Sequence, residues 1–274
     1  MQPGLDNLPE PADLHARLTK TRRLDWGQPV PRKSEIAAAY GDSATAQSII
    51  LLARAAEVEP RLTDELVASL GEGATAHQLE SRLKSPQSLA RKIRKQAGTE
   101  FGKQPIEDVV RYTIVVADPD DLVAASVDAH GALNGRGWKI NGAVQSYADG
   151  SRYKGLHMFL QKFDQRVELQ VHSNESITVK TRTTPLYVVE RDPDQPRAER
   201  VKARNEAIAL SAAMRQPAGI DDLTSLGGVP VEVRVYGRRG RPTEGRGRGN
   251  GSSRVERSGT KQSIEYSRKN GRAR

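Results

Sequence analysis

One short segment of the sequence, "SRLKSPQSLARKIRKQ", holds three Arg and three Lys in sixteen positions. Ser85 and Pro86 are typical of the N-cap and first residue of a helix, so we expect a helix to begin there. Four side chains that can bind phosphate lie at its start: Arg82, Lys84, Ser88 and Lys92. Free N–H groups and a positive dipole end at a helix start favour the same ligand. The alternative is a basic helix with a solvated face, which composition alone favours.

Three further segments have apolar residues at alternate positions and predict strands: "VVRYTIVVA", "YKGLHMFLQ" and "RVELQVHS". If these strands pair, one face of their sheet is polar and carries Arg111, Thr113, Tyr153, His157, Glu168, Gln170 and His172. A second carboxylate, Asp108, stands where the first strand begins. Glu168 lies between apolar neighbours, where an ionised carboxylate needs a cation. Two carboxylates near a phosphate-binding helix are what Mg²⁺-dependent phosphoryl transfer requires.

In this order and spacing the motifs resemble the synthetase domain of the RelA/SpoT family: Arg82-x-Lys84-x₃-Ser88-x₃-Lys92, Asp108, Tyr153-x-x-Leu156-His157 and Glu168-x-Gln170. The resemblance covers roughly residues 75–192 and implies a nucleotidyltransferase-like fold. Members of this family move the pyrophosphate of ATP onto a 3′-hydroxyl, classically of GDP or GTP, to give (p)ppGpp. The resemblance therefore implies an enzyme, a pyrophosphokinase that uses ATP and Mg²⁺.

The resemblance also implies a role for each matched residue. The ATP-binding residues would be Arg82, Lys84, Ser88, Lys92 and Arg111. The catalytic and Mg²⁺-binding residues would be Asp108 and Glu168. The acceptor-binding residues would be Arg152, Tyr153, Lys154, His157, Gln170 and His172. Among these, Arg82 would clamp the adenine of ATP, Glu168 would be the base for the attacking hydroxyl, and Tyr153 would stack on the acceptor base.

The chain departs from the family pattern in several places. It has "SRYKGLH" where the family has "NGYQSLH", "ELQVHS" where the family has "EIQIRT", and Thr113 where the family has an arginine that Arg111 could replace. These departures resemble the divergent branch of small alarmone synthetases and polymorphic or phage-borne toxins. Members of that branch make (p)ppGpp or (p)ppApp, or pyrophosphorylate the 3′ CCA end of tRNA. The expected partners are ATP, a guanosine or adenosine nucleotide or tRNA as acceptor, and an antitoxin or immunity protein. A catalytically silent relative that binds nucleotide or RNA is the rival interpretation.

The net charge of +9 is placed at one end of the chain. Residues 237–274 hold twelve Lys/Arg and three Asp/Glu, so the remainder, with 31 of each, has no net charge. This tail could attract nucleic acid or only keep the protein soluble. Cysteine is absent, which excludes disulfides and thiolate metal sites. No signal-peptide core or membrane-length apolar run occurs, so we expect a cytoplasmic protein without a membrane partner.

The order of expected elements predicts an α/β (α+β) protein with a mixed sheet flanked by helices. A first helix would be interrupted near Gly41 and end at Pro60, before a second short helix. No role is expected for His77, and a solvated face is favoured for Lys180 over acceptor-phosphate binding. We expect four parts: a loose N-terminal arm (1–33), a helical region (34–74), the synthetase-like domain with its C-terminal helix (75–236) and a disordered Arg/Gly-rich tail (237–274).

Overall fold

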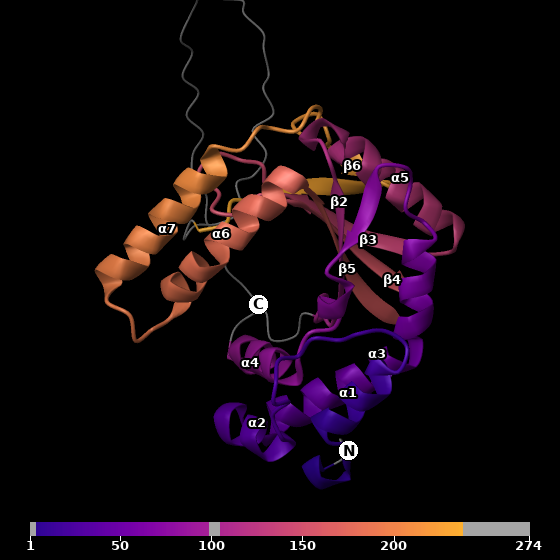
Figure 1. Ribbon diagram of the computed structural model, residues 1–274, viewed down its shortest axis with the longest axis vertical. Helices are drawn as coiled ribbons and strands as arrows, with labels where there is room; N and C mark the ends of the chain where they lie inside the picture. The colour runs from indigo at the N-terminus through magenta and orange to yellow at the C-terminus, as the bar shows by residue number, and fades with distance from the viewer. Residues whose placement is uncertain (1–3, 99–104, 238–274) are drawn as a thin grey trace, which may run out of the picture. The chain divides into compact units, whose positions relative to one another are not determined.

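The computed structural model describes residues 4–98 and 105–237 of the chain (Figure 1). Apart from Gly237, the tail expected to be disordered lies outside the described residues. The described part contains one mixed sheet of seven strands with helices around it. The α+β class expected from the sequence is therefore confirmed.

The strands are β1 (Ala74–His77), β2 (Val110–Val116), β3 (Lys139–Gln145), β4 (Leu156–Lys162), β5 (Gln165–Ser173), β6 (Ser225–Leu226) and β7 (Val229–Val233). Their order across the sheet is β1-β2-β5-β4-β3-β7-β6. β2 runs parallel to β5, and β3 runs parallel to β7, while the other neighbouring pairs are antiparallel. The strands expected in the motif region are present, and β1 adds an edge strand to the sheet.

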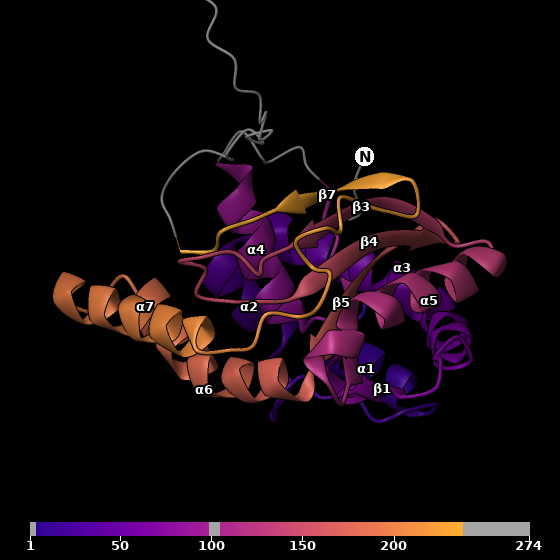
Figure 2. The ribbon, with the colours of Figure 1, turned by 90° about the horizontal axis from the view of Figure 1, so that it is seen from above.

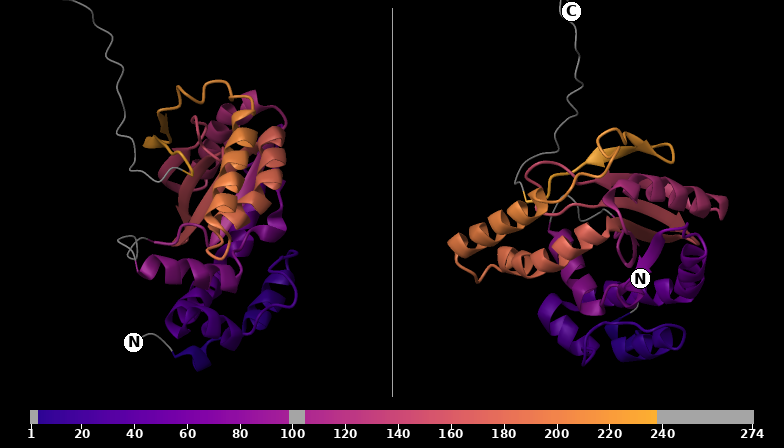
Figure 3. Two further views of the ribbon diagram at one scale, coloured as in Figure 1. Left: turned by 90° about the vertical axis from the view of Figure 1, so that its left-hand side faces the viewer. Right: turned by 45° about the horizontal axis from the view of Figure 1, so that its top comes forward.

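The α-helices of the described part are α1 (Pro11–Thr19), α2 (Lys33–Tyr40), α3 (Asp42–Val67), α4 (Pro86–Ala97), α5 (Leu122–Gly135), α6 (Asn174–Arg191) and α7 (Arg197–Ala212). Short 3₁₀ helices lie at η1 (Leu5–Asn7), η2 (Leu79–Ser81) and η4 (Pro119–Asp121). Figure 3 shows α6 and α7 side by side as an antiparallel pair. Among the described helices, none is long and apolar enough to span a membrane.

The two faces of the sheet differ in chemistry. Helices α3 and α5 contact the strand β5 (Figure 2). The buried apolar side chains of β2, β4 and β5 are Tyr112, Ile114, Met158, Leu160, Val167, Leu169 and Val171. The intervening residues form a polar face, which α6 contacts over β5 and β2. The alternation of apolar and polar side chains inferred from the sequence is thus confirmed in all three strands. The candidate functional residues lie on the polar face.

Helix α3 does not end at Pro60 as the sequence predicts, but continues through it to Val67. A proline inside a helix removes one intrahelical hydrogen bond and costs about 3 kcal/mol. The apolar stripe of α3 continues on both sides of the proline, because Leu52, Leu62 and Leu66 are all buried. Burying this stripe against the sheet offsets the local cost, so one long helix replaces the two that were expected.

Residues 4–33 are not the loose arm that the sequence predicts. They contain η1 and α1, and four of their apolar side chains are buried: Leu14, Leu18, Leu24 and Trp26. The indole Nε1–H of Trp26 donates a hydrogen bond to the Leu83 carbonyl oxygen over 3.1 Å. The high proline and charge content of this segment predicted a loose arm, but its apolar residues pack onto the same core as α3.

A buried ion pair joins α3 to the segment before α4. Arg82 is 1% exposed and Glu59 is fully buried, and Arg82 Nη2 lies 3.3 Å from Glu59 Oε2 while Nε contacts Oε1. Arg82 also donates to the carbonyl oxygens of Arg23, at 2.6 Å, and Leu79, at 3.1 Å. Glu59 accepts a further bond from the Thr63 hydroxyl. All of these partners of the guanidinium lie inside the protein. They fix Arg82, and with it the backbone two positions before Lys84.

We expect the substitution Glu59→Gln to lower the free energy of unfolding by about 3–5 kcal/mol, because it leaves the Arg82 guanidinium buried without a counter-charge. Urea unfolding followed by circular dichroism measures this loss. The control is Glu57→Gln, since Glu57 pairs with Arg17 on the surface with 68% of its side chain exposed. That variant should change stability by less than about 1 kcal/mol. Equal stability of the two variants would contradict the importance of the buried pair.

Candidate active site

The start of α4 has the geometry that its sequence predicts. Ser85 is the N-cap, its Oγ accepts a hydrogen bond from the Ser88 N–H at 3.3 Å, and Pro86 is the first helical residue. The helix is anchored by buried Leu89. Just before it, the Lys84 N–H donates to the Val109 carbonyl oxygen at 3.0 Å, which holds this segment beside the beginning of β2. This hydrogen bond holds the phosphate-binding candidates near the beginning of β2.

Asp108 lies between the two lysines of this motif. Its Oδ2 is 2.8 Å from Lys84 Nζ, and its Oδ1 is 2.6 Å from Lys92 Nζ. Burial alone would raise the pKa of Asp108, but the charges and hydrogen bonds of the two lysines outweigh burial and lower the pKa from 3.8 to about 2. The carboxylate is therefore ionised at neutral pH, and both of its oxygens are bound by cations.

The parallel pairing of β2 and β5 brings the remaining candidates together. In this register Arg111 lies opposite Glu168 and Thr113 lies opposite Gln170. On the other side of β5, the antiparallel strand β4 places His157 opposite Gln170. Side chains directly opposite each other share a face of the sheet, so these residues form one polar cluster. The Arg111 side chain has no ion pair with another described residue.

A chain of hydrogen bonds crosses this cluster from Glu168 to α6. Glu168 Oε1 lies 2.9 Å from His157 Nδ1, and the Tyr153 hydroxyl lies 2.8 Å from both His157 Nε2 and His172 Nε2. His172 Nδ1 is in turn 2.9 Å from the Ser176 hydroxyl on α6. In this series of hydrogen bonds both imidazoles and the phenol have a partner on each side, so the three rings hold each other in place.

The environment sets the protonation of these groups. Burial would raise the pKa of Glu168, but its hydrogen bond and charge interaction with His157 lower the pKa below its ordinary value. Burial, and then the charge of Lys180, lower the pKa of His172 well below its ordinary value. Burial and the nearby Glu168 raise the pKa of Tyr153. At neutral pH the cluster therefore contains an ionised carboxylate, a neutral His172 and a protonated phenol.

Three of the predicted site residues are placed differently from the expectation. Arg82 does not face the cluster, because its guanidinium is buried against Glu59, and this contradicts the predicted adenine clamp. Arg152 has its guanidinium over the Tyr187 ring, 4.5 Å from the ring centroid, and Nε 3.1 Å from Glu190 Oε2, so it contacts α6. Lys154 is buried beside Tyr153 and forms no hydrogen bond or ion pair with any described residue.

The structure adds two residues that the sequence interpretation left without a role. His77 lies on β1 opposite Thr113, which places it on the polar face. Lys180, on α6, donates from Nζ to Gln170 Oε1 over 3.0 Å, and burial followed by the charge of Arg111 lowers its pKa to about 8. The four-residue spacing of Ser176 and Lys180 on one helix face was the available signal for Lys180. No comparable signal existed for His77, because no strand was expected at β1.

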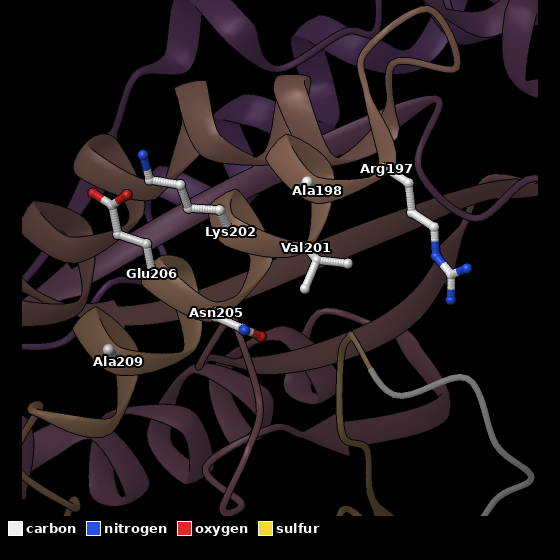
Figure 4. A pocket seen from close by; sticks show the side chains of 7 residues that line it. All are labelled: Arg197, Ala198, Val201, Lys202, Asn205, Glu206 and Ala209. Atoms are coloured by element: carbon white, nitrogen blue, oxygen red, sulfur yellow. The ribbon is translucent and has the colours of Figure 1, made fainter.

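A separate hollow of about 1010 Å³ lies on α7 (Figure 4). It is lined by Arg197, Ala198, Val201, Lys202, Asn205, Glu206 and Ala209. All of these residues come from one helix, and Figure 4 shows their side chains spread along it rather than converging on a point. The hollow therefore lacks the converging groups that the polar sheet face provides.

Comparison with known proteins gives structural neighbours only. No protein-family model matches the chain, and no curated protein matches it. Small alarmone synthetase 1 from Bacillus subtilis is similar with 15% identity over 59% of this chain and 87% of that chain, at a TM-score of 0.38. The same enzyme bound to its product pppGpp gives 13% identity over 59% and 88%, at 0.35. A GTP pyrophosphokinase family protein from Streptococcus pneumoniae gives 15% identity over 69% and 93%, at 0.35. TM-scores this low establish neither a shared activity nor shared site residues.

We expect Gly155→Ala to disturb the histidine–tyrosine chain. A Cβ atom at this position would lie 2.9 Å from His172 Cε1 and 3.0 Å from the Tyr153 hydroxyl, so a ring would have to move. Urea unfolding should show a loss of about 1–3 kcal/mol, and the NMR resonances of the His172 ring should shift. In the control Gly142→Ala, on β3, the nearest atom is Phe159 Cδ2 at 3.7 Å, an ordinary contact. Unchanged His172 resonances in Gly155→Ala would contradict the close packing.

The ion pairs of Asp108 should make stability depend on pH. Because the pKa is lowered on folding from 3.8 to about 2, the unfolded chain binds the proton more tightly, and stability falls as pH falls through this window. The difference in unfolding free energy between the wild type and Asp108→Asn, about 2 kcal/mol at neutral pH, should shrink between pH 5 and pH 3. Urea unfolding at each pH measures it. Asp64→Asn, which removes a surface pair with Arg22, serves as the control, and a difference that stays constant with pH would contradict the prediction.

Proposed function

We propose that this protein is an ATP-dependent pyrophosphotransferase that moves the pyrophosphate of ATP onto the 3′-hydroxyl of a nucleotide. One observation carries the proposal: Glu168 lies on the polar face of β5, and a second ionised carboxylate, Asp108, binds Lys84 and Lys92 just before the neighbouring strand β2, at the capped helix α4. A polyphosphate chain needs cations, and its transfer to a hydroxyl needs a base and hard oxygen ligands. The polar face provides all three kinds of group.

In this proposal the phosphates of ATP bind to Lys84, Ser88 and Lys92. Both lysines now bind Asp108, at 2.8 and 2.6 Å, and phosphate oxygens would take over these contacts. Asp108 and Glu168 would then be available as oxygen ligands for Mg²⁺, an ion that proteins usually hold through one or two carboxylates and the substrate phosphates. The two carboxylates are ionised at neutral pH, so the donor set fits this ion. Mg²⁺ would supply neutralisation of phosphate charge.

In the proposed reaction Glu168 acts as the base. The acceptor 3′-oxygen attacks the β-phosphorus of ATP, a new O–P bond forms, and the bond from the β-phosphorus to the bridging oxygen breaks to release AMP. The hydroxyl proton passes to a Glu168 carboxylate oxygen. His157 Nδ1, at 2.9 Å, orients this carboxylate and keeps it ionised until then. Lys84 and Lys92 stabilise the charge that moves onto the phosphates.

The acceptor is proposed to bind next to Tyr153, whose hydroxyl is fixed by two imidazoles. His157, Gln170 and His172 form the polar wall beside its ring, and Lys154 lies buried next to it. A guanosine or adenosine nucleotide as acceptor gives (p)ppGpp or (p)ppApp as product. The alternative acceptor is the 3′ CCA end of tRNA, which would block translation. Either reaction consumes ATP or stops translation, so we propose that the activity inhibits growth and is held in check by an antitoxin or immunity protein.

The substitution Glu168→Gln should lower the rate of transfer by at least about 10²-fold, because it removes the base and one oxygen ligand. The assay incubates labelled ATP and Mg²⁺ separately with GDP, GTP, ADP or bulk tRNA and measures AMP. The matched control is Glu206→Gln, an exposed residue of α7, which should retain wild-type activity. Circular dichroism of both variants checks that the fold is intact.

Each result of this assay has a definite meaning. AMP formed by the wild type only with tRNA selects the tRNA-modifying alternative. Absence of AMP with every acceptor contradicts the proposed enzyme and favours a silent nucleotide- or RNA-binding protein. Full activity of Glu168→Gln contradicts the role of this residue while leaving the reaction itself in place.

A further inference from the structure

Lys180 is a cation held over the polar face by the fold itself. It lies in the second turn of α6, a helix whose start is fixed by the Ser173 cap, with Ser173 Oγ accepting from the Ser176 N–H at 3.2 Å. Its Nζ donates to Gln170 Oε1 over 3.0 Å. Among the described residues, no carboxylate lies within ion-pair distance of it. The ammonium group is half-buried, and it has one neutral hydrogen-bond partner and no ion pair with a described carboxylate.

Three elements of the sheet place titratable groups near Lys180, and among these groups Arg111 adds positive charge. From β2 comes Arg111, which also has no ion pair with a described residue. From β1 comes His77, which is neutral at pH 7 because burial and then the charge of Lys180 lower its pKa. From β5 come Gln170 and Glu168, but the Glu168 carboxylate is bound by His157 and by the Gln170 amide, at 3.2 Å. Arg111 lies opposite Glu168, two residues before the Gln170 that binds Lys180, so both cations lie over the same stretch of β5. Burial and then the charge of Arg111 lower the pKa of Lys180 to about 8. Two unpaired cations held close together are unfavourable unless an anion lies between them.

The position of Lys180 along the strand separates it from the lysines of α4. Lys84 and Lys92 bind Asp108, which precedes the first residue of β2. Lys180 binds Gln170 instead, and Gln170 lies opposite Thr113, the fourth residue of β2. Arg111 lies between these two places. The cations therefore follow β2 from one end of the polar face towards the other, and only the first two are neutralised by a carboxylate.

We propose that Lys180, together with Arg111, forms a second phosphate-binding subsite on the polar face, which takes a phosphate group of one of the two nucleotides. The inference rests on the proposed function for the origin of this phosphate, but not for the binding itself. The hydrogen bond to Gln170 aims the ammonium group at the face, and the Thr113 hydroxyl donates to the same Gln170 oxygen over 3.5 Å. A lysine needed only to bind Gln170 could be replaced by a neutral donor, whereas a phosphate subsite requires its charge.

The test is a titration of the full chain with inorganic pyrophosphate, in which isothermal titration calorimetry measures the affinity. Lys180→Met should weaken binding about tenfold or more, as expected for the loss of a charged hydrogen-bond partner. Lys180→Arg should keep most of the affinity, because it keeps the charge. Arg182→Met, two residues further along α6 and exposed, should bind like the wild type. Lys180→Gln keeps a donor for Gln170 without the charge, and it gives the same test if Lys180→Met does not fold.

Two nucleotide titrations then identify the source of the phosphate. If Lys180→Met loses affinity only for the non-hydrolysable donor α,β-methylene-ATP, the subsite belongs to the donor. A loss for GDP or ADP that is absent for the corresponding nucleoside assigns it to the acceptor. Pyrophosphate affinity that is unchanged in Lys180→Met and Lys180→Gln, or absent in the wild type, overturns the proposal. If the wild type binds pyrophosphate through Lys180 but forms no AMP, the subsite stands and the proposed reaction fails.

Discussion

The parallel register of β2 and β5 is the constraint on which the candidate site depends. It places Arg111 opposite Glu168 and Thr113 opposite Gln170, while the apolar residues between them face α3 and α5. A shift of one residue would turn every one of these polar side chains into the core and bring the apolar ones to the surface. The cost of burying the charges and exposing the apolar residues makes the register unique. The same hydrophobic pattern that folds the sheet therefore also assembles the chemistry.

Near the polar face the carboxylates have charged or hydrogen-bonding partners, whereas two of the cations have no ion pair. This difference, more than any single residue, indicates which ligand the face can bind. Two carboxylates are each engaged, Asp108 by two lysines and Glu168 by His157 and Gln170. Arg111 and Lys180 remain without a carboxylate among the described residues. Unneutralised cations in a half-buried place reduce stability, and a protein keeps them where an anionic ligand supplies the missing charge. A polyphosphate is the ligand class that matches several cations arranged along one strand.

The sequence predicted the parts of this site that depend on local periodicity and missed those that depend on distant packing. The period of two placed Glu168, Gln170 and His172 on one face, and the Ser85–Pro86 pair placed the start of α4; both are confirmed in the structure. The position of Arg82 could not be read locally, because its partner Glu59 lies in α3, beyond a helix end that Pro60 wrongly suggested. Lys180 looked solvated for the same reason, since its burial arises only when α6 packs over β5.

The N-terminal residues complete this dependence. Trp26 donates to the carbonyl oxygen of Leu83, and the carbonyl oxygen of Arg23 accepts from Arg82, so both contacts converge on the two residues that precede Lys84. The amide of Lys84 is then held by Val109, next to Asp108. Movement of the N-terminal segment would shift Lys84 relative to its carboxylate, because the chain between them is fixed at each step. The segment expected to be a loose arm thus supports the proposed phosphate-binding lysine Lys84, and Arg82 acts on that position through the backbone that it anchors.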